Sequence, residues 1–139
     1  MKSRALYKLV GLGCLVAACG CGQLLDPDTV VTPLVGPYYF FTDYEGYSCV
    51  QYGRGWLRPA PVLAGPVADS VGEVGKYLAV CVGDDEAPRQ YYLLPLAAAS
   101  AAQAQARRLG PLSAAAYYER RRLTSGAVRP LTSAGRWRR

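Results

Sequence analysis

The sequence contains no histidine, and it has only one methionine, two tryptophans and two phenylalanines among 139 residues. Histidine is the commonest general base in enzymes and the commonest metal-ligating side chain, so its absence removes the usual route to both kinds of site. The five cysteines do not show the paired CxxC spacing of structural zinc sites. We therefore expect no metal, no cofactor and no enzymatic activity.

The sequence also lacks an apolar run long enough to form a membrane-spanning helix near its N-terminus. The uncharged run there covers residues 9–18 and follows three basic residues, Lys2, Arg4 and Lys8. A spanning helix needs about 20 apolar residues, whereas this charged-then-apolar layout is typical of a secretory signal. We expect residues 1–18 to be a cleaved signal peptide, with a retained membrane anchor as the less favoured alternative.

The end of this run, Val16-Ala17-Ala18-Cys19, resembles the lipobox of bacterial lipoproteins. In that family the cysteine becomes the mature N-terminus, and its thiol carries a diacylglyceryl group, usually with a further acyl chain such as palmitate on the amine. The resemblance implies lipidation of Cys19 and attachment to a membrane of the cell envelope, because two or more acyl chains hold a protein on a bilayer stably. Cys21 is a competing site with a poorer match, and secretion after cleavage near Ala18 is the alternative.

Three thiols remain after such processing, at Cys21, Cys49 and Cys81. Export leads to an oxidising compartment in which disulfides are permitted. Cys49 and Cys81 each lie in a strand-like segment, so a disulfide between them is one interpretation. Burial as two small hydrophobic side chains is the other.

Beyond Gly36, short aromatic and β-branched runs alternate with glycine, proline and acidic residues. This pattern predicts a small antiparallel sheet of about five strands. The alanine-rich segment 97–109 predicts a helix, and Ser113 can cap a second helix over residues 114–123. In that second helix we expect Ala116 and Leu123 to face the sheet, together with the preceding Leu112.

These elements predict a single α+β domain over residues 36–123. Residues 19–35 contain prolines without a clear period, so we expect a lipid-anchored tether there. Residues 124–139 are rich in arginine and in residues that break regular structure. We therefore expect a disordered, basic tail.

The order of segments within residues 36–123 also resembles a group of uncharacterised small lipoprotein domains. The matching motifs are a first strand, a valine-glycine turn, two later strands and a helix start, at residues 38–40, 71–72, 76–80, 91–94 and 110–113. The resemblance implies a membrane-tethered α+β domain and carries no activity. The arginine-rich end departs from the pattern of this group.

Tyrosine is the most frequent aromatic residue, and several of the eleven tyrosines occur as doublets. Adjacent residues on a strand point to opposite faces, so one tyrosine of a doublet can pack in the core while the other lies outside. An exposed row of tyrosines would bind a glycan or an envelope protein, and ordinary β propensity is the alternative explanation. The doublets that would supply this surface are Tyr38-Tyr39 and Tyr91-Tyr92.

Charge is divided unevenly along the chain. Residues 19–106 carry nine acidic and four basic side chains, a net charge of −5, and residues 107–139 carry nine arginines and one glutamate, a net charge of +8. A basic tail would contact anionic lipid headgroups, and a solvated tail or one folded back on the acidic body is the alternative. Nucleic acid is not an expected partner, because export separates the chain from it. The residues of this membrane contact are Arg136, Trp137, Arg138 and Arg139.

Taken together, these features favour a non-enzymatic binding module on the envelope. The alternative is an inhibitor or immunity protein against an exported enzyme, in which the acidic loop 84–86 mimics a charged substrate. An enzyme would instead need a pocket that gathers Asp43, Glu45 or Asp69 with a perturbed pKa.

Overall fold

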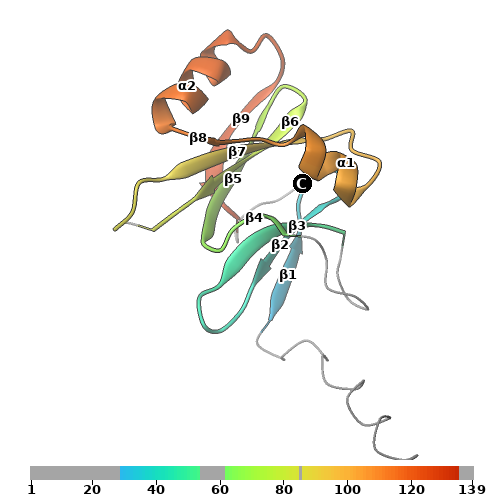
Figure 1. The fold of residues 1–139 in the computed structure, drawn as a ribbon, viewed down its shortest axis with the longest axis vertical. Helices are drawn as coiled ribbons and strands as arrows, with labels where there is room; N and C mark the ends of the chain where they lie inside the picture. The colour runs from blue at the N-terminus through green and yellow to red at the C-terminus, as the bar shows by residue number, and fades with distance from the viewer. Residues whose placement is uncertain (1–28, 54–61, 85, 135–139) are drawn as a thin grey trace, which may run out of the picture.

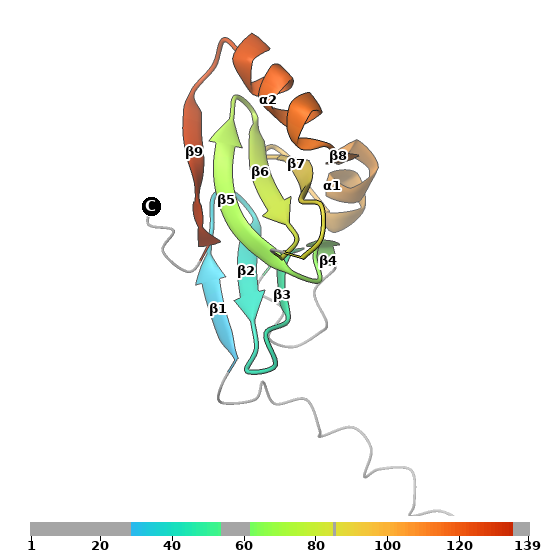
Figure 2. The same cartoon turned by 90° about the vertical axis from the view of Figure 1, so that its left-hand side faces the viewer.

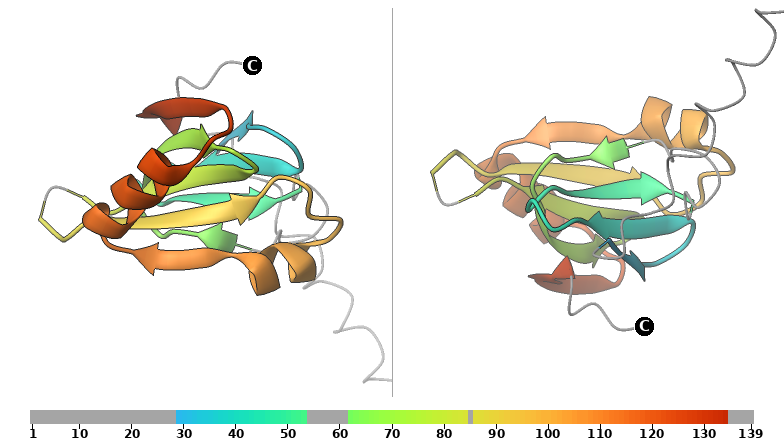
Figure 3. Two further views of the ribbon diagram at one scale, coloured as in Figure 1. Left: turned by 90° about the horizontal axis from the view of Figure 1, so that it is seen from above. Right: turned by 90° about the horizontal axis from the view of Figure 1, so that it is seen from below.

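The structure is a computed structural model, and it describes residues 29–53, 62–84 and 86–134. Within these ranges the chain forms nine strands and two helices, arranged as two antiparallel sheets. Figures 1 and 3 show three stacked layers: helix α2, then the five-stranded sheet, then the four-stranded sheet. The predicted α+β class is confirmed, although the strands form two sheets where the sequence pattern predicted one.

The four-stranded sheet has the strand order β1-β2-β3-β4. Strands β2 and β3 form a hairpin whose turn is held by Asp43, because its carboxylate accepts hydrogen bonds from the amides of Glu45 at 3.0 Å and Tyr47 at 2.9 Å. This is the local bonding that makes aspartate a frequent turn residue. The strands are β1 (Val30–Pro33), β2 (Tyr38–Thr42), β3 (Ser48–Tyr52) and β4 (Val62–Ala64).

The five-stranded sheet has the order β8-β7-β6-β5-β9, with β6 in the middle. Side chains of β6 alternate between its two faces, and both faces are buried, so the strand reads as a continuous apolar run. The strands are β5 (Ala68–Val74), β6 (Tyr77–Val82), β7 (Gln90–Pro95), β8 (Leu109–Leu112) and β9 (Val128–Ser133).

The main core lies between the two sheets. Apolar side chains of the four-stranded sheet, such as Phe40 and Val50, pack in one cluster with Leu78 and Val80 of the five-stranded sheet. Tyr38 also spans the two layers, because its ring is fully buried and its hydroxyl donates a hydrogen bond to the Pro95 carbonyl at 2.5 Å. Burial of this apolar surface is the main stabilising contribution to the fold.

Two short helices complete the domain. Helix α1 (Ala101–Arg107) buries Ala104 in the main core, and helix α2 (Ala114–Leu123) lies on the outer face of the five-stranded sheet (Figure 2). The predicted cap of α2 is confirmed, because the Ser113 hydroxyl accepts a hydrogen bond from the Ala116 amide at 3.2 Å. Neither helix is long and apolar enough to cross a membrane.

Two predicted boundaries of the domain are wrong. Strand β1 lies within the predicted tether, and strand β9 lies within the tail that was expected to be disordered. Pro130 interrupts regular pairing and removes one amide donor, so the sequence pattern does not indicate a strand there. The strand forms nevertheless, because it lies at the edge of the sheet, where proline is tolerated. The signal peptide, most of the tether and residues 135–139 lie outside the described residues.

Gly72 explains how β9 can pair with β5. The register of this pair shifts between Val71 and Glu73, opposite Pro130. A Cβ at position 72 would lie 2.6 Å from the carbonyl oxygen of Arg129 and 3.1 Å from the amide nitrogen of Leu131. The glycine therefore permits a close backbone approach that no other residue would allow.

We predict that Gly72→Ala lowers the free energy of unfolding by about 1–3 kcal/mol, because the added methyl group pushes β9 away from β5. Urea unfolding measures this loss, and hydrogen exchange should show faster exchange across residues 128–133. Thr132→Ala, an exposed change in β9, is the control and should alter stability by less than about 0.5 kcal/mol. An unchanged G72A protein with protected β9 amides would contradict the pairing.

Candidate interaction surface

The four tyrosines of the predicted binding surface do not lie side by side. Tyr38 is in the core between the sheets, and Tyr91 is buried on the opposite face of the five-stranded sheet. Tyr39 lies half-buried on the outer face of the four-stranded sheet. Tyr92 packs against the main core, with the Arg108 guanidinium 5.0 Å from its ring centre. The doublets divide between two faces as predicted, but they form no common row.

Ring contacts among three tyrosines hold α2 against the five-stranded sheet. Tyr91 and Tyr117 stack with ring centres 4.6 Å apart and an interplanar angle of 9°. Tyr118 lies edge-on to both rings, at 6.1 Å from Tyr91 and 5.0 Å from Tyr117. Tyr117 is the buried side chain of α2, and its hydroxyl has no hydrogen-bond partner among the described residues. The helix is therefore held mainly by ring packing.

The two buried cysteines are free thiols in the structure, which agrees with their burial as small hydrophobic side chains rather than with a disulfide between them. Cys49 points to the outer face of the four-stranded sheet, where it is paired across from Phe41. Cys81 points to the outer face of the five-stranded sheet, in the cluster with Tyr91 and Tyr117. The main core separates the two thiols. Burial raises the pKa of both thiols, as expected for small buried hydrophobic side chains.

The carboxylates that an enzyme would need are not gathered into a pocket. Asp43 and Glu45 belong to the β2–β3 turn, and the Asp43 carboxylate accepts hydrogen bonds from two amides of that turn. Asp69 lies in the other sheet, with a carboxylate oxygen 3.8 Å from the Arg89 guanidinium. Asp84 accepts hydrogen bonds from two amides of its own loop, so it shapes the loop itself. No group of three potential metal ligands occurs in the described ranges.

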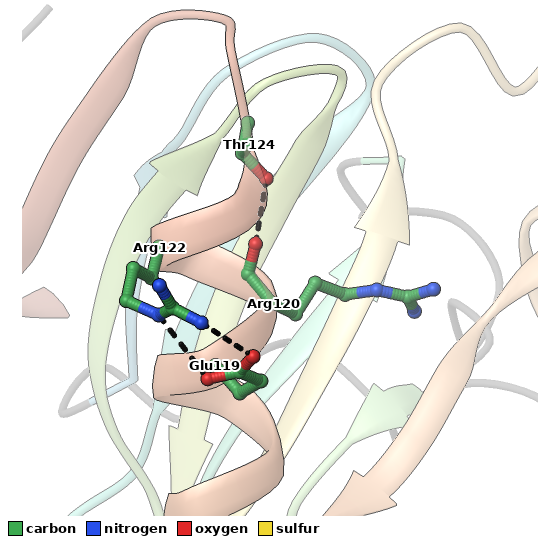
Figure 4. Close-up of polar contacts among 4 residues, drawn as sticks. All are labelled: Glu119, Arg120, Arg122 and Thr124. Carbon is green, nitrogen blue, oxygen red and sulfur yellow. Dashed lines mark hydrogen bonds and ion pairs between the residues drawn. The ribbon is translucent and has the colours of Figure 1, made fainter.

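The outward face of α2 carries the charged side chains of Glu119, Arg120 and Arg122 (Figure 4), and it also exposes Leu123. Glu119 and Arg122 form a two-point ion pair, with N–O distances of 3.2 and 2.8 Å. The Arg120 side chain extends away from this pair, and its carbonyl accepts a hydrogen bond from the Thr124 hydroxyl at 2.9 Å. Leu123 ends the helix and is 68% exposed.

Part of this face borders an open depression of about 500 Å³. It is lined by Ala116, Glu119, Arg120, Leu123 and Thr124. The prediction that Ala116 and Leu123 face the sheet is wrong, because Tyr117 takes the inward position and turns both residues outward. We name this exposed surface the α2 face. The clue in the sequence is the tyrosine doublet, whose larger rings compete better for burial than alanine does.

Several predicted sites fall outside the described residues. They are the lipidation site Cys19 and the membrane-contacting residues Arg136, Trp137, Arg138 and Arg139.

Fold and surface together define a two-sheet α+β domain that displays an arginine-bearing helix. Comparison of the chain with protein-family models, with curated proteins and with solved structures found no match.

We predict that Tyr117→Phe leaves the free energy of unfolding unchanged or raises it by up to about 1 kcal/mol, because it removes a buried hydroxyl that has no partner. Tyr117→Ala should lower stability by about 3–5 kcal/mol and release α2, since it removes the ring that holds the helix. Urea unfolding gives both values, and hydrogen exchange over residues 114–123 reports release. A Y117F protein as unstable as Y117A would show that the hydroxyl is bonded.

Burial raises the pKa of Tyr38 and of Tyr91 to about 12, from an ordinary value of 10.0. The folded state therefore favours the protonated phenol, and this stabilisation is complete below pH 10 and lost between pH 10 and 12. We predict a loss of about 1.4 kcal/mol per tyrosine by about pH 11. Urea unfolding at about pH 9 and about pH 11 measures the loss. Tyr91→Phe should reduce it, and an equal loss in Y91F would contradict the assignment.

Proposed function

We propose that this chain is a lipid-anchored protein of the bacterial cell envelope, and that its domain is a non-enzymatic module that binds an acidic envelope component through the α2 face. The anchor part rests on the lipobox resemblance of Val16-Ala17-Ala18-Cys19. The binding part rests on one observation, which is the exposure of Arg120 and Leu123 side by side on α2.

Arginine and an exposed leucine suit a protein or glycan partner with negative charge. A guanidinium binds a carboxylate through two parallel hydrogen bonds, and arginine is enriched in protein interfaces. Leu123 supplies apolar contact area beside it. Basic residues in the last turn also stabilise a helix through its dipole, which accounts for some of the arginines of α2. The dipole does not account for a leucine that is 68% exposed in the same turn.

The non-enzymatic part of the proposal is supported by the residue types in the chain and by the local bonds of its carboxylates. The chain has no histidine, and the carboxylates of Asp43 and Asp84 are engaged by amides of their own turns. Asp69, on β5, has a carboxylate oxygen 3.8 Å from the Arg89 guanidinium. These three carboxylates therefore hold local structure and are not brought together as an acid–base pair in the part of the chain that the structure describes.

We predict that Arg120→Glu weakens partner binding at least tenfold, or by about 1.4 kcal/mol, because it reverses a charge at the centre of the α2 face. The amount of partner recovered with the chain after crosslinking in intact cells measures this. Arg107→Glu is the matched control, since Arg107 is also an exposed arginine in the last turn of a helix. Equal recovery with both variants would contradict binding through α2.

The same preparation tests the anchor. Intact mass of the membrane-fraction protein should correspond to a chain that begins at Cys19 and carries a diacylglyceryl group. A mass that includes residues 1–18 would contradict lipidation and would favour a retained membrane anchor.

A further inference from the structure

The end of the domain at which the chain enters the fold also carries Tyr44, the most exposed aromatic side chain among the described residues. Val30, the first residue of β1, is paired with Thr42, the last residue of β2, so the β2–β3 turn lies next to the entry point. Figures 1 and 2 show this turn and the start of β1 at one end of the long axis, with α2 at the other.

Apolar side chains gather around that turn. Tyr44 is 66% exposed, Val30 is 54% exposed and Tyr47 is 36% exposed. Phe41 lies edge-on to Tyr47, with ring centres 6.2 Å apart. We name this group the hairpin tip. Single exposed tyrosines are ordinary on a protein surface, but several apolar groups at one end of a domain indicate a contact surface.

The turn already holds the shape that displays these rings. The Asp43 carboxylate accepts two amide hydrogen bonds, and the Asp43 amide donates to the Tyr47 carbonyl at 3.0 Å. Tyr44 also donates a hydrogen bond from its hydroxyl to the Glu45 carboxylate at 3.1 Å. Little conformational entropy is then lost when the tip meets a surface, which favours binding.

The length of the chain before β1 limits where that surface can be. Val30 is eleven residues from Cys19. An extended chain covers at most about 3.6 Å per residue, so Val30, beside the hairpin tip, lies within about 40 Å of a lipidated Cys19. A short connection to this end favours an orientation in which the same end faces the bilayer.

We propose that the hairpin tip docks onto the membrane that holds the lipid anchor, with Tyr44 and Tyr47 at the level of the lipid headgroups. This inference rests on the lipidation of Cys19 in the proposed function. Tyrosine favours the membrane interface because its ring is apolar and its hydroxyl is polar. The carboxylates of Asp43 and Glu45 select zwitterionic headgroups, since an anionic surface would repel them.

Tryptophan fluorescence in lipid vesicles tests the orientation. The processed protein, which begins at the lipidated Cys19, is placed in phosphatidylcholine vesicles that contain brominated phosphatidylcholine, which quenches nearby tryptophan. Tyr44→Trp puts a probe in the hairpin tip, and Leu123→Trp puts the control at the opposite end, at a residue of nearly equal exposure. Trp56 and Trp137 are present in both variants, so their emission is subtracted with the wild-type protein.

We expect the added emission of Y44W to shift to shorter wavelength and to lose intensity as brominated lipid increases, whereas that of L123W stays unquenched. Equal quenching of the two probes, or stronger quenching of L123W, would overturn the docking. Intact mass separates the two proposals. A lipidated protein with an unquenched Y44W contradicts only the docking, whereas a chain without lipid on Cys19 contradicts the proposed anchor on which the docking rests.

Discussion

Strand β6 must bury both of its faces, and the rest of the fold provides a cover for each. Leu78 and Val80 point to one side, where the four-stranded sheet encloses them in the main core. Ala79 and Cys81 point to the other side, where they pack with Tyr91 and with Tyr117 of α2. A sheet with one polar face would need a single cover, so the apolar run of β6 is the reason that the domain has three layers.

The second cover also explains the surface that the domain displays. Helix α2 has ten residues, fewer than the roughly 12–15 that make an isolated helix even marginally stable in water, so it depends on packing. That packing comes through the Tyr117 ring, stacked on Tyr91. Because Tyr117 is the buried residue of the helix, most of α2 faces solvent, and Arg120 and Leu123 are available to a partner.

Local patterns were enough to predict the elements that make local bonds. The Ser113 cap follows from a short-range hydrogen bond and is found where expected. The turn after β2 is held by the same kind of local bond, from the Asp43 carboxylate to the Tyr47 amide. Strand β9 and the placement of the thiols depend on distant pairing. The need for glycine at position 72 becomes evident only from the close approach of the β9 backbone. Alternation along a strand shows which side chains share a face, but not which layer covers that face. The sequence could therefore predict the class of the fold, but not its second sheet or the α2 face.

The folding pattern turns the uneven charge of the sequence into a difference between the two ends of the molecule. The acidic part of the chain supplies the hairpin tip, with Asp43 and Glu45 beside the start of β1, and the arginine-rich part supplies α2 at the far end (Figure 1). A lipid anchor would restrict the domain to a thin layer above the bilayer and raise the local concentration of partners there. Orientation then decides which surface those partners meet. If the hairpin tip faces the lipid headgroups, the α2 face points away from them, toward acidic components in the space beyond.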